Sequence, residues 1–296
     1  MLSVAPERPL DPETLEVLRR ADRVARELAL DCFVVGAMAR DILLTGVFGL
    51  SAGRATRDVD LAVAVEGWPQ FEAIKARLVG TGAFNSDERV AQRLYYRAAS
   101  AGRGHPLDLI PFGGVELSGG KIAWPPDRAV VMNVAGYGEA FASAVPVEVE
   151  PGFAVRVASL PGLAILKLVA WADRGTGDPR DTIDLATLLR QYGAAGNEDR
   201  LYGTEIGVLE VVNYDLDLAG ARLLGMDAGR IAAPSTRGQI LALFDDPARL
   251  DRLVLGVARG LRAARDAVTA AGELLAQFKA GFQTFGSTRL PMRSET

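Results

Sequence analysis

The stretch Arg54-Ala-Thr-Arg-Asp58-Val-Asp60-Leu-Ala-Val-Ala-Val65 decides the fold. Its second half is rich in valine, alanine and leucine, which predicts a β-strand buried on at least one face. Side chains two apart on a strand share a face, so Asp58 and Asp60 place two carboxylates together where this strand begins. Like charges beside a core are unfavourable unless a cation neutralises them, and a hard divalent ion is the natural candidate. In isolation, however, an Asp-x-Asp pair is more often a solvated strand end.

The upstream segment Cys32-Phe-Val-Val-Gly36-Ala-Met-Ala-Arg40-Asp41 adds the context that the aspartates need. An apolar run of strand type stops at Gly36 and passes directly into a helix-type segment, so backbone N–H groups of a helix start face open space and can hold a phosphate. A strand, a glycine turn, a helix and a second strand with paired aspartates follow one another in the nucleotidyltransferases related to DNA polymerase β. The sequence resembles that superfamily here.

Length and composition bound the remaining possibilities. With 296 residues the chain is long enough for two ordinary domains. It has no apolar run of transmembrane length and no signal pattern at its N-terminus, so we expect a cytoplasmic protein without a membrane partner. A net charge of −4 argues against non-specific coating of nucleic acid but allows a local basic groove. The single histidine, His105, excludes a histidine-rich metal site, so carboxylates must hold any metal.

The order of strand and helix patterns predicts an α+β fold. We expect a nucleotidyltransferase catalytic domain over residues 1–158, with a mixed sheet and flanking helices that include one starting at Asp11 and hairpins near 93–112 and 146–158. From Leu160 the hydrophobic period becomes helical, which predicts an α-helical domain over 159–282 that completes the cleft. A polar tail follows over 283–296.

Asp108 is the candidate for a third carboxylate. It interrupts the apolar strand Leu107-Asp108-Leu-Ile-Pro-Phe112, so it lies either on the exposed face of an edge strand or next to something positive. In the second case Asp58, Asp60 and Asp108 bind two Mg²⁺ ions, one bridging the triphosphate of an incoming NTP and the other activating the attacking hydroxyl. Asp108 is also a candidate for accepting the hydroxyl proton.

Further residues are candidates for contacts to the nucleotide. The turn at Gly36 and Ala37 is placed to hold the β- and γ-phosphates, and Arg40 and Arg57 could add positive charge, although each is more often a solvated arginine. Lys167 interrupts an apolar helical pattern, so it either snorkels to the surface or reaches the triphosphate from the second domain. Arg174 follows seven residues later on the same helical face.

Arg89, Arg93 and Arg97 are candidates for binding the acceptor. They recur at spacings of four, Tyr95 and Tyr96 lie among them, and no acid occurs from Arg89 through Leu107. Cations interleaved with rings are suited to single-stranded RNA ends, while the plainer interpretation is the charged outer face of a sheet.

Taken in order, the motifs resemble the AbiEii/AbiGii nucleotidyltransferase toxin family. They are Gly36-x3-Arg40-Asp41, Arg54-Ala-Thr-Arg-Asp58-Val-Asp60, Asp108-Leu-Ile-Pro-Phe-Gly-Gly-Val-Glu116, Trp124-Pro-Pro-Asp127, Lys167-x6-Arg174 and Arg180-Asp181-x2-Asp184.

The resemblance implies a bilobed magnesium-dependent enzyme that transfers NMP from an NTP to an RNA 3′ end, such as that of tRNA. It also implies a toxin in a toxin–antitoxin or phage-defence system, paired with a winged-helix antitoxin. By motif, Asp58 and Asp60 would be metal ligands, Lys167 a triphosphate contact and Asp181 a further site residue. The chain departs from the superfamily at Ala37, where glycine or serine is usual.

Two other functions remain open at this point. A small-molecule nucleotidyltransferase that inactivates an antibiotic would use the same carboxylates and have no need of the arginine cluster. A catalytically idle regulatory or binding protein with this fold would keep Asp58 and Asp60 only as surface charges.

Overall fold

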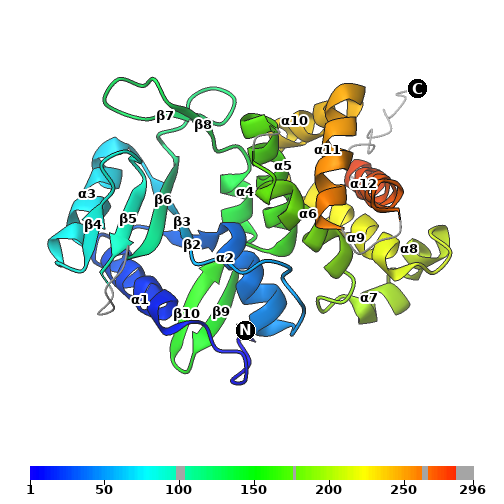
Figure 1. Cartoon of the computed structure of the whole chain (residues 1–296), viewed down its shortest axis with the longest axis horizontal. Coiled ribbons are helices and arrows are strands. Elements are labelled where there is room, and N and C mark those ends of the chain that lie inside the picture. Colours follow the sequence, from blue (N-terminus) through cyan, green and yellow to red (C-terminus); the bar gives the residue numbers. More distant parts are fainter. Residues whose placement is uncertain (98–103, 176–177, 262–265, 285–296) are drawn as a thin grey trace, which may run out of the picture.

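The chain forms a sheet-based half followed by a helical half, which lie side by side along the long axis of the molecule (Figure 1). The computed structural model describes residues 1–97, 104–175, 178–261 and 266–284. Most of the predicted polar tail, from residue 285 onward, therefore lies outside the described residues.

In the described part of the chain, the first half forms an eight-stranded mixed sheet in the order β1-β9-β10-β2-β3-β6-β5-β4. Its strands are β1 (Leu2–Ser3), β2 (Cys32–Val35), β3 (Val59–Val65), β4 (Phe84–Ser86), β5 (Arg93–Tyr96), β6 (His105–Gly113), β9 (Val145–Glu150) and β10 (Phe153–Val157). A separate hairpin pairs β7 (Lys121–Ala123) with β8 (Val131–Asn133). The antiparallel pairing of β5 with β6 and of β9 with β10 confirms both predicted hairpins.

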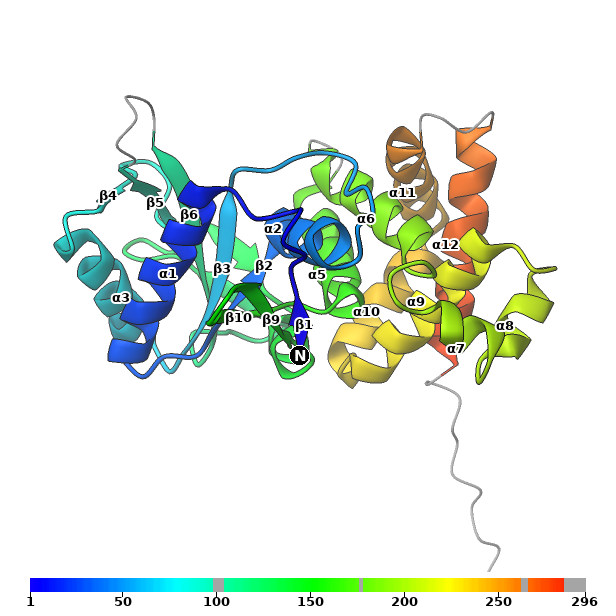
Figure 2. The same ribbon diagram turned by 90° about the horizontal axis from the view of Figure 1, so that it is seen from below.

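Helices pack against the sheet, as Figure 2 shows for α1 (Pro12–Glu27) and α3 (Trp68–Gly80). Those of the first half are α1 (Pro12–Glu27), α2 (Gly36–Asp41), the π-helix η1 (Ile42–Val47), α3 (Trp68–Gly80) and α4 (Tyr137–Ala142). The helix predicted at Asp11 is confirmed, because the Asp11 side chain accepts a hydrogen bond from the N–H of Thr14 and caps α1. Helices α1 and α3 contact β3, whereas α4 contacts β6 through Phe141 and Phe112, whose ring centroids are 5.6 Å apart.

The second half is helical, as predicted. Its helices are α5 (Leu160–Arg174), α6 (Arg180–Gln191), α7 (Glu198–Tyr202), α8 (Ile206–Val211), α9 (Leu216–Ile231), α10 (Pro234–Asp245), α11 (Pro247–Gly260) and α12 (Ala267–Gln283). Among the described helices, none is both long and apolar enough to cross a membrane.

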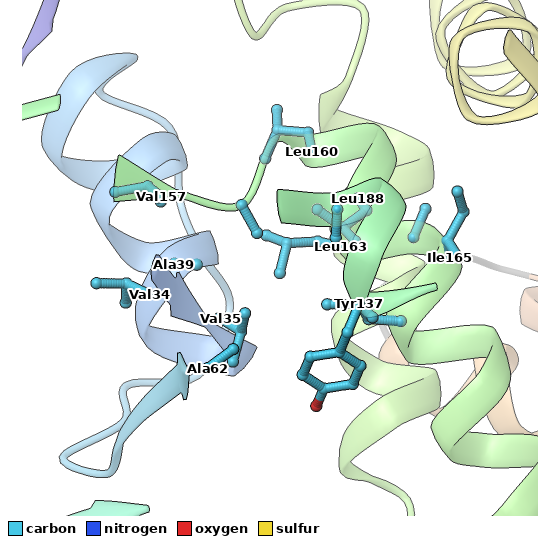
Figure 3. Packing of buried hydrophobic residues seen from close by; sticks show 14 of the residues in the cluster. Val34, Val35, Ala39, Ala62, Tyr137, Val157, Leu160, Leu163, Ile165 and Leu188 are labelled. Carbon is cyan, nitrogen blue, oxygen red and sulfur yellow. The ribbon is translucent and has the colours of Figure 1, made fainter. Parts of the chain in front are cut away.

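One hydrophobic core runs through both halves. Figure 3 shows Val35 and Ala62 of the sheet across from Tyr137 and Leu163 of the helices. The change from strand to helix falls between Val157 and Leu160, at the predicted boundary, yet buried side chains are continuous across it. Independent folding of the two halves stays a prediction.

Candidate active site

A cavity of about 290 Å³ lies between the sheet and helices α5 and α6. It brings together residues that are far apart in the sequence and that the motifs single out. The sequence-predicted residues in its lining are Gly36, Ala37, Asp58, Asp60, Arg93, Asp108, Lys167, Arg174 and Asp181.

Strand register explains why the carboxylates meet. Asp60 of β3 lies directly opposite Asp108 of the parallel strand β6, so their side chains project from the same sheet face. Asp58 precedes β3 by one residue and shares that face with Asp60. Asp108 therefore faces the cavity on a central strand, and the edge-strand alternative is wrong.

Gly36 allows the sheet to pass into α2 directly beside Asp60. Its φ of +67° lies in the left-handed region, which favours glycine. A Cβ at this position would lie 2.0 Å from Oδ2 of Asp60. The residue that starts the helix must therefore be glycine for Asp60 to keep its place.

Asp58 and Asp60 are the uncompensated carboxylates of the cavity. Within the described residues, neither side chain forms a hydrogen bond or an ion pair. Burial, followed by the negative charge of Asp108, raises the pKa of Asp60 to about 7, although Lys167 opposes this shift. A divalent cation would relieve this excess of negative charge, so Asp58 and Asp60 fit one such ion.

Asp108 is in a different state, because Arg93 binds it. The Arg93 guanidinium donates from Nε to Oδ1 and from Nη2 to Oδ2 of Asp108, both at 2.7 Å. This bidentate pair raises the pKa of Arg93, so the guanidinium stays charged. No group of three acidic, histidine or cysteine residues in the described part of the chain is arranged to hold a metal ion. The predicted site of three aspartates is thus not formed in this state.

Lys167 and Arg174 line the cavity from α5, and both pair with carboxylates of α6. Lys167 Nζ lies 3.2 Å from Oδ1 of Asp181 and 2.6 Å from Oδ2 of Asp184. Arg174 Nη2 lies 2.7 Å from Oδ2 of Asp181. The Lys167 side chain is only 11% exposed and lines the cavity, so it does not snorkel to the surface.

Asp184 joins the two halves. Its side chain is fully buried and pairs with Arg40, Arg54 and Lys167, with Arg54 Nε 2.9 Å from Oδ1. Burial alone would raise the pKa of Asp184, but Lys167, Arg40 and Arg54 together hold it below its ordinary value. The Arg180-Asp181-x2-Asp184 motif therefore supplies two cavity residues, Arg180 and Asp181, and one buried structural residue, Asp184.

Arg40 and Arg57 do not line the cavity, in contrast to the prediction. Arg40 is 1% exposed, and besides Asp184 it binds Asp41 and the backbone carbonyl of Arg54. Arg57 points away from the cavity to Glu13, 3.2 Å distant, and is 74% exposed. Arg40 packs against Asp184 of α6, and the sequence alone does not show this contact.

The three arginines predicted to bind the acceptor are separated. Arg89 lies in an exposed turn before β5, and Arg97 lies exposed after it with its guanidinium donating to Asn85. Arg93 turns into the cavity towards Asp108. Tyr96 packs against Phe84, with ring centroids 5.5 Å apart, so it is part of the sheet's packing.

Several cavity residues have no counterpart among the sequence-based candidates. They are Arg54, Thr56, Gln92, Met132, Asn133, Tyr137, Asp173, Asp178 and Arg180. Arg54 and Arg180 stand in the quoted motifs, so their positions carried a signal. Met132, Asn133 and Tyr137 reach the cavity from β8 and α4, which no local pattern connects with the aspartates.

The family comparison agrees with this geometry. The sequence profile described as nucleotidyl transferase AbiEii toxin, type IV toxin–antitoxin system, matches residues 20–225, more than half of the chain. The chain belongs to the AbiEii nucleotidyltransferase toxin family. The AbiEii match includes both halves of the cavity and implies an antitoxin partner.

The solved structures that match the chain are distant in sequence. The antibiotic-resistance factor ANT(2'')-Ia is 18% identical, with 69% of this chain and 99% of that chain covered and a TM-score of 0.38. A CCA-adding enzyme in complex with ATP is 16% identical, with coverages of 92% and 68% and a TM-score of 0.28. The Thermotoga maritima CCA-adding enzyme with tRNA is 14% identical, with coverages of 96% and 85% and a TM-score of 0.26. No curated protein matches the chain significantly.

Proposed function

We propose that this AbiEii family member transfers a nucleoside monophosphate from an NTP to the 3′ end of an RNA, with tRNA as the acceptor, and that it acts as a toxin in the cytoplasm. The observation that carries the proposal is the pair of uncompensated carboxylates, Asp58 and Asp60, facing Lys167 and Arg174 across one cavity. Excess negative charge on one wall suits a metal ion, and cations on the other suit the triphosphate.

In the proposed reaction, the acceptor hydroxyl oxygen forms a bond to the α-phosphorus of the NTP. The bond from that phosphorus to the bridging oxygen breaks, pyrophosphate leaves, and the proton of the acceptor hydroxyl is released to water. Lys167 and Arg174 would bind the triphosphate and the leaving pyrophosphate, beside the turn at Gly36 and Ala37. A divalent ion at Asp58 and Asp60 would supply charge neutralisation of the phosphates when bound.

The number of ions depends on Asp108. Transfer with two Mg²⁺ ions requires this carboxylate as a ligand, and in the present state Arg93 occupies both of its oxygens. The Asp58 and Asp60 pair fits a first ion without any rearrangement of Arg93.

Incubation with each labelled NTP, Mg²⁺ and total tRNA tests the proposal. We expect label at RNA 3′ ends, and Asp60→Asn should abolish it. Glu66→Gln, which alters an exposed acid just past the other end of β3, is the matched control and should label RNA normally.

Unlabelled RNA with every NTP would refute RNA end transfer. Pyrophosphate release that depends on an aminoglycoside would instead identify a small-molecule nucleotidyltransferase. If Mg²⁺ and NTP together failed to raise the melting temperature, the chain would be a catalytically idle member of the family.

The partner can be tested separately. We propose that the antitoxin implied by the family is a winged-helix protein encoded beside this chain. Its co-expression should restore growth in cells that produce the active protein, and unrestored growth would exclude that pairing.

A further inference from the structure

Arg93 occupies the position at Asp108 where a second metal ion would have to bind. Both oxygens of Asp108 accept hydrogen bonds from its guanidinium, each at 2.7 Å. Asp58 and Asp60, in the same cavity, have no such partner within the described residues. The three carboxylates therefore differ in the positive charge available to them.

We propose that Arg93 serves as the second cation of the substrate-free site. The protein then binds one divalent ion, at Asp58 and Asp60, and a second ion can bind only after Arg93 leaves Asp108. This inference rests on the proposed nucleotidyl transfer for its meaning, but its test counts metal ions and does not depend on turnover.

The strand order fixes this arrangement. Strands β3, β6 and β5 are neighbours, and Asp108 is the register partner of both Asp60 on one side and Arg93 on the other. The three side chains therefore form a row on one sheet face. Because the backbone pairing brings Arg93 to Asp108, the contact is built into the sheet and is not a chance contact of a surface side chain.

Burial strengthens the pair. The side chain of Asp108 is 13% exposed and that of Arg93 is 28% exposed, so water screens their attraction only in part. A bidentate guanidinium is also held in a fixed orientation, unlike the point charge of a lysine.

Charge balance agrees with a single ion in this state. Asp58 and Asp60 have no ion-pair partner among the described residues and can take one divalent ion, whereas Arg93 already pairs with Asp108. A second divalent ion at Asp108 would meet the repulsion of a positive charge only a few ångströms away. The described residues accordingly contain no group of three carboxylates arranged for metal binding.

The other cations of the cavity do not take this role. Lys167 and Arg174 bind Asp181, Arg54 binds Asp184, and Arg180 binds Asp178. Among the described residues, no ion pair joins any of these four cations to Asp108. Removing the Arg93 charge should therefore leave Asp108 free for a metal ion.

Counting bound Mn²⁺ on the full chain without substrate tests the proposal, with electron paramagnetic resonance of free Mn²⁺ at pH 8. We expect one bound ion for the wild type and two for Arg93→Gln. The double variant Arg93→Gln/Asp108→Asn should return to one. Arg97→Gln, which removes an exposed arginine just beyond the same strand, is the matched control and should bind one ion.

Two bound ions in the wild type, or one in Arg93→Gln, would overturn the proposal. Arg93→Met, which keeps side-chain length without charge, is a second variant in case the first does not fold, and it should also bind two ions. A wild type with two ions that labels RNA would leave the proposed function intact. One bound ion in the wild type and two in Arg93→Gln, without transfer of a nucleotide to RNA, would support the role of Arg93 and refute the proposed function.

Discussion

The carboxylate of Asp60 fills the space that a side chain on residue 36 would need. A Cβ on Gly36 would lie 2.0 Å from Oδ2 and 2.8 Å from Cγ of Asp60. The turn that starts α2 and the carboxylate that we propose as a metal ligand are therefore sterically coupled.

Gly36→Ala should destabilise the protein and displace Asp60. The left-handed conformation alone costs an alanine about 1 kcal/mol, and the clash should bring the total to about 3 kcal/mol. Gly82→Ala is the matched control, because Gly82 has a φ of +74° and a Cβ added there would have no neighbour within 4 Å. Urea unfolding measures both losses, and equal losses would show that Asp60 does not fill the space beside Gly36.

The raised pKa of Asp60 predicts a pH-dependent stability difference. Ionisation of Asp60 is harder in the folded protein, where its pKa is about 7, than in the unfolded chain, where the ordinary value is 3.8. The folded state binds the extra proton, so stability falls as the pH rises through this window and levels off above it. The melting temperature of Asp60→Asn relative to that of the wild type should therefore rise between about pH 4 and pH 7.

Saturating Mg²⁺ at pH 8 should raise the melting temperature of the wild type and not that of Asp60→Asn. Without Mg²⁺, a difference in melting temperature between Asp60→Asn and the wild type that stayed constant with pH would contradict the burial of an unpaired carboxylate at position 60.

Asp184→Asn should cause a large loss of stability. The carboxylate is fully buried and pairs with Arg40, Arg54 and Lys167, so its removal leaves buried positive charge uncompensated. The expected loss is about 3–5 kcal/mol in urea unfolding. Asp217→Asn, which breaks a half-exposed pair with Arg190, should cost less than about 1 kcal/mol. Similar losses for both variants would argue against the Asp184 junction.

Arg57→Ala should leave nucleotide binding unchanged. The guanidinium is exposed and faces Glu13, outside the cavity, despite its position beside Asp58 in the sequence. The KM for the NTP should therefore stay within about twofold of the wild-type value, and stability should change by less than about 1 kcal/mol. A tenfold rise in KM would place Arg57 at the phosphates after all.

Local patterns were sufficient to predict much of the sheet and of one cavity wall. The apolar residues between Asp58 and Val65, the glycine at position 36 and the hairpin pattern near 146–158 each depend on neighbours in the sequence, and each gives the predicted element. The single acid in each of two apolar strands marks Asp60 and Asp108 as candidates, but their position opposite each other comes from the parallel pairing of β3 with β6.

The partners of the charged residues could not be predicted in the same way. Arg40 binds Asp184, 144 residues further along the chain, and nothing near Arg40 in the sequence shows that a helix of the second half covers it. Arg93 binds Asp108 because one register, among several that the strand pattern allows, sets them opposite each other. Charge pairing across a fold depends on tertiary contacts, which a single sequence does not display.

The buried junction at Asp184 limits how a partner protein could inhibit this AbiEii family member. A protein that bound by separating the sheet from the helices would have to break the ion pairs of Asp184 with three cations, which come from both halves of the molecule. A protein that bound over the entrance of the cavity would leave these ion pairs intact. Binding over the cavity entrance therefore costs far less free energy than separating the two halves at Asp184.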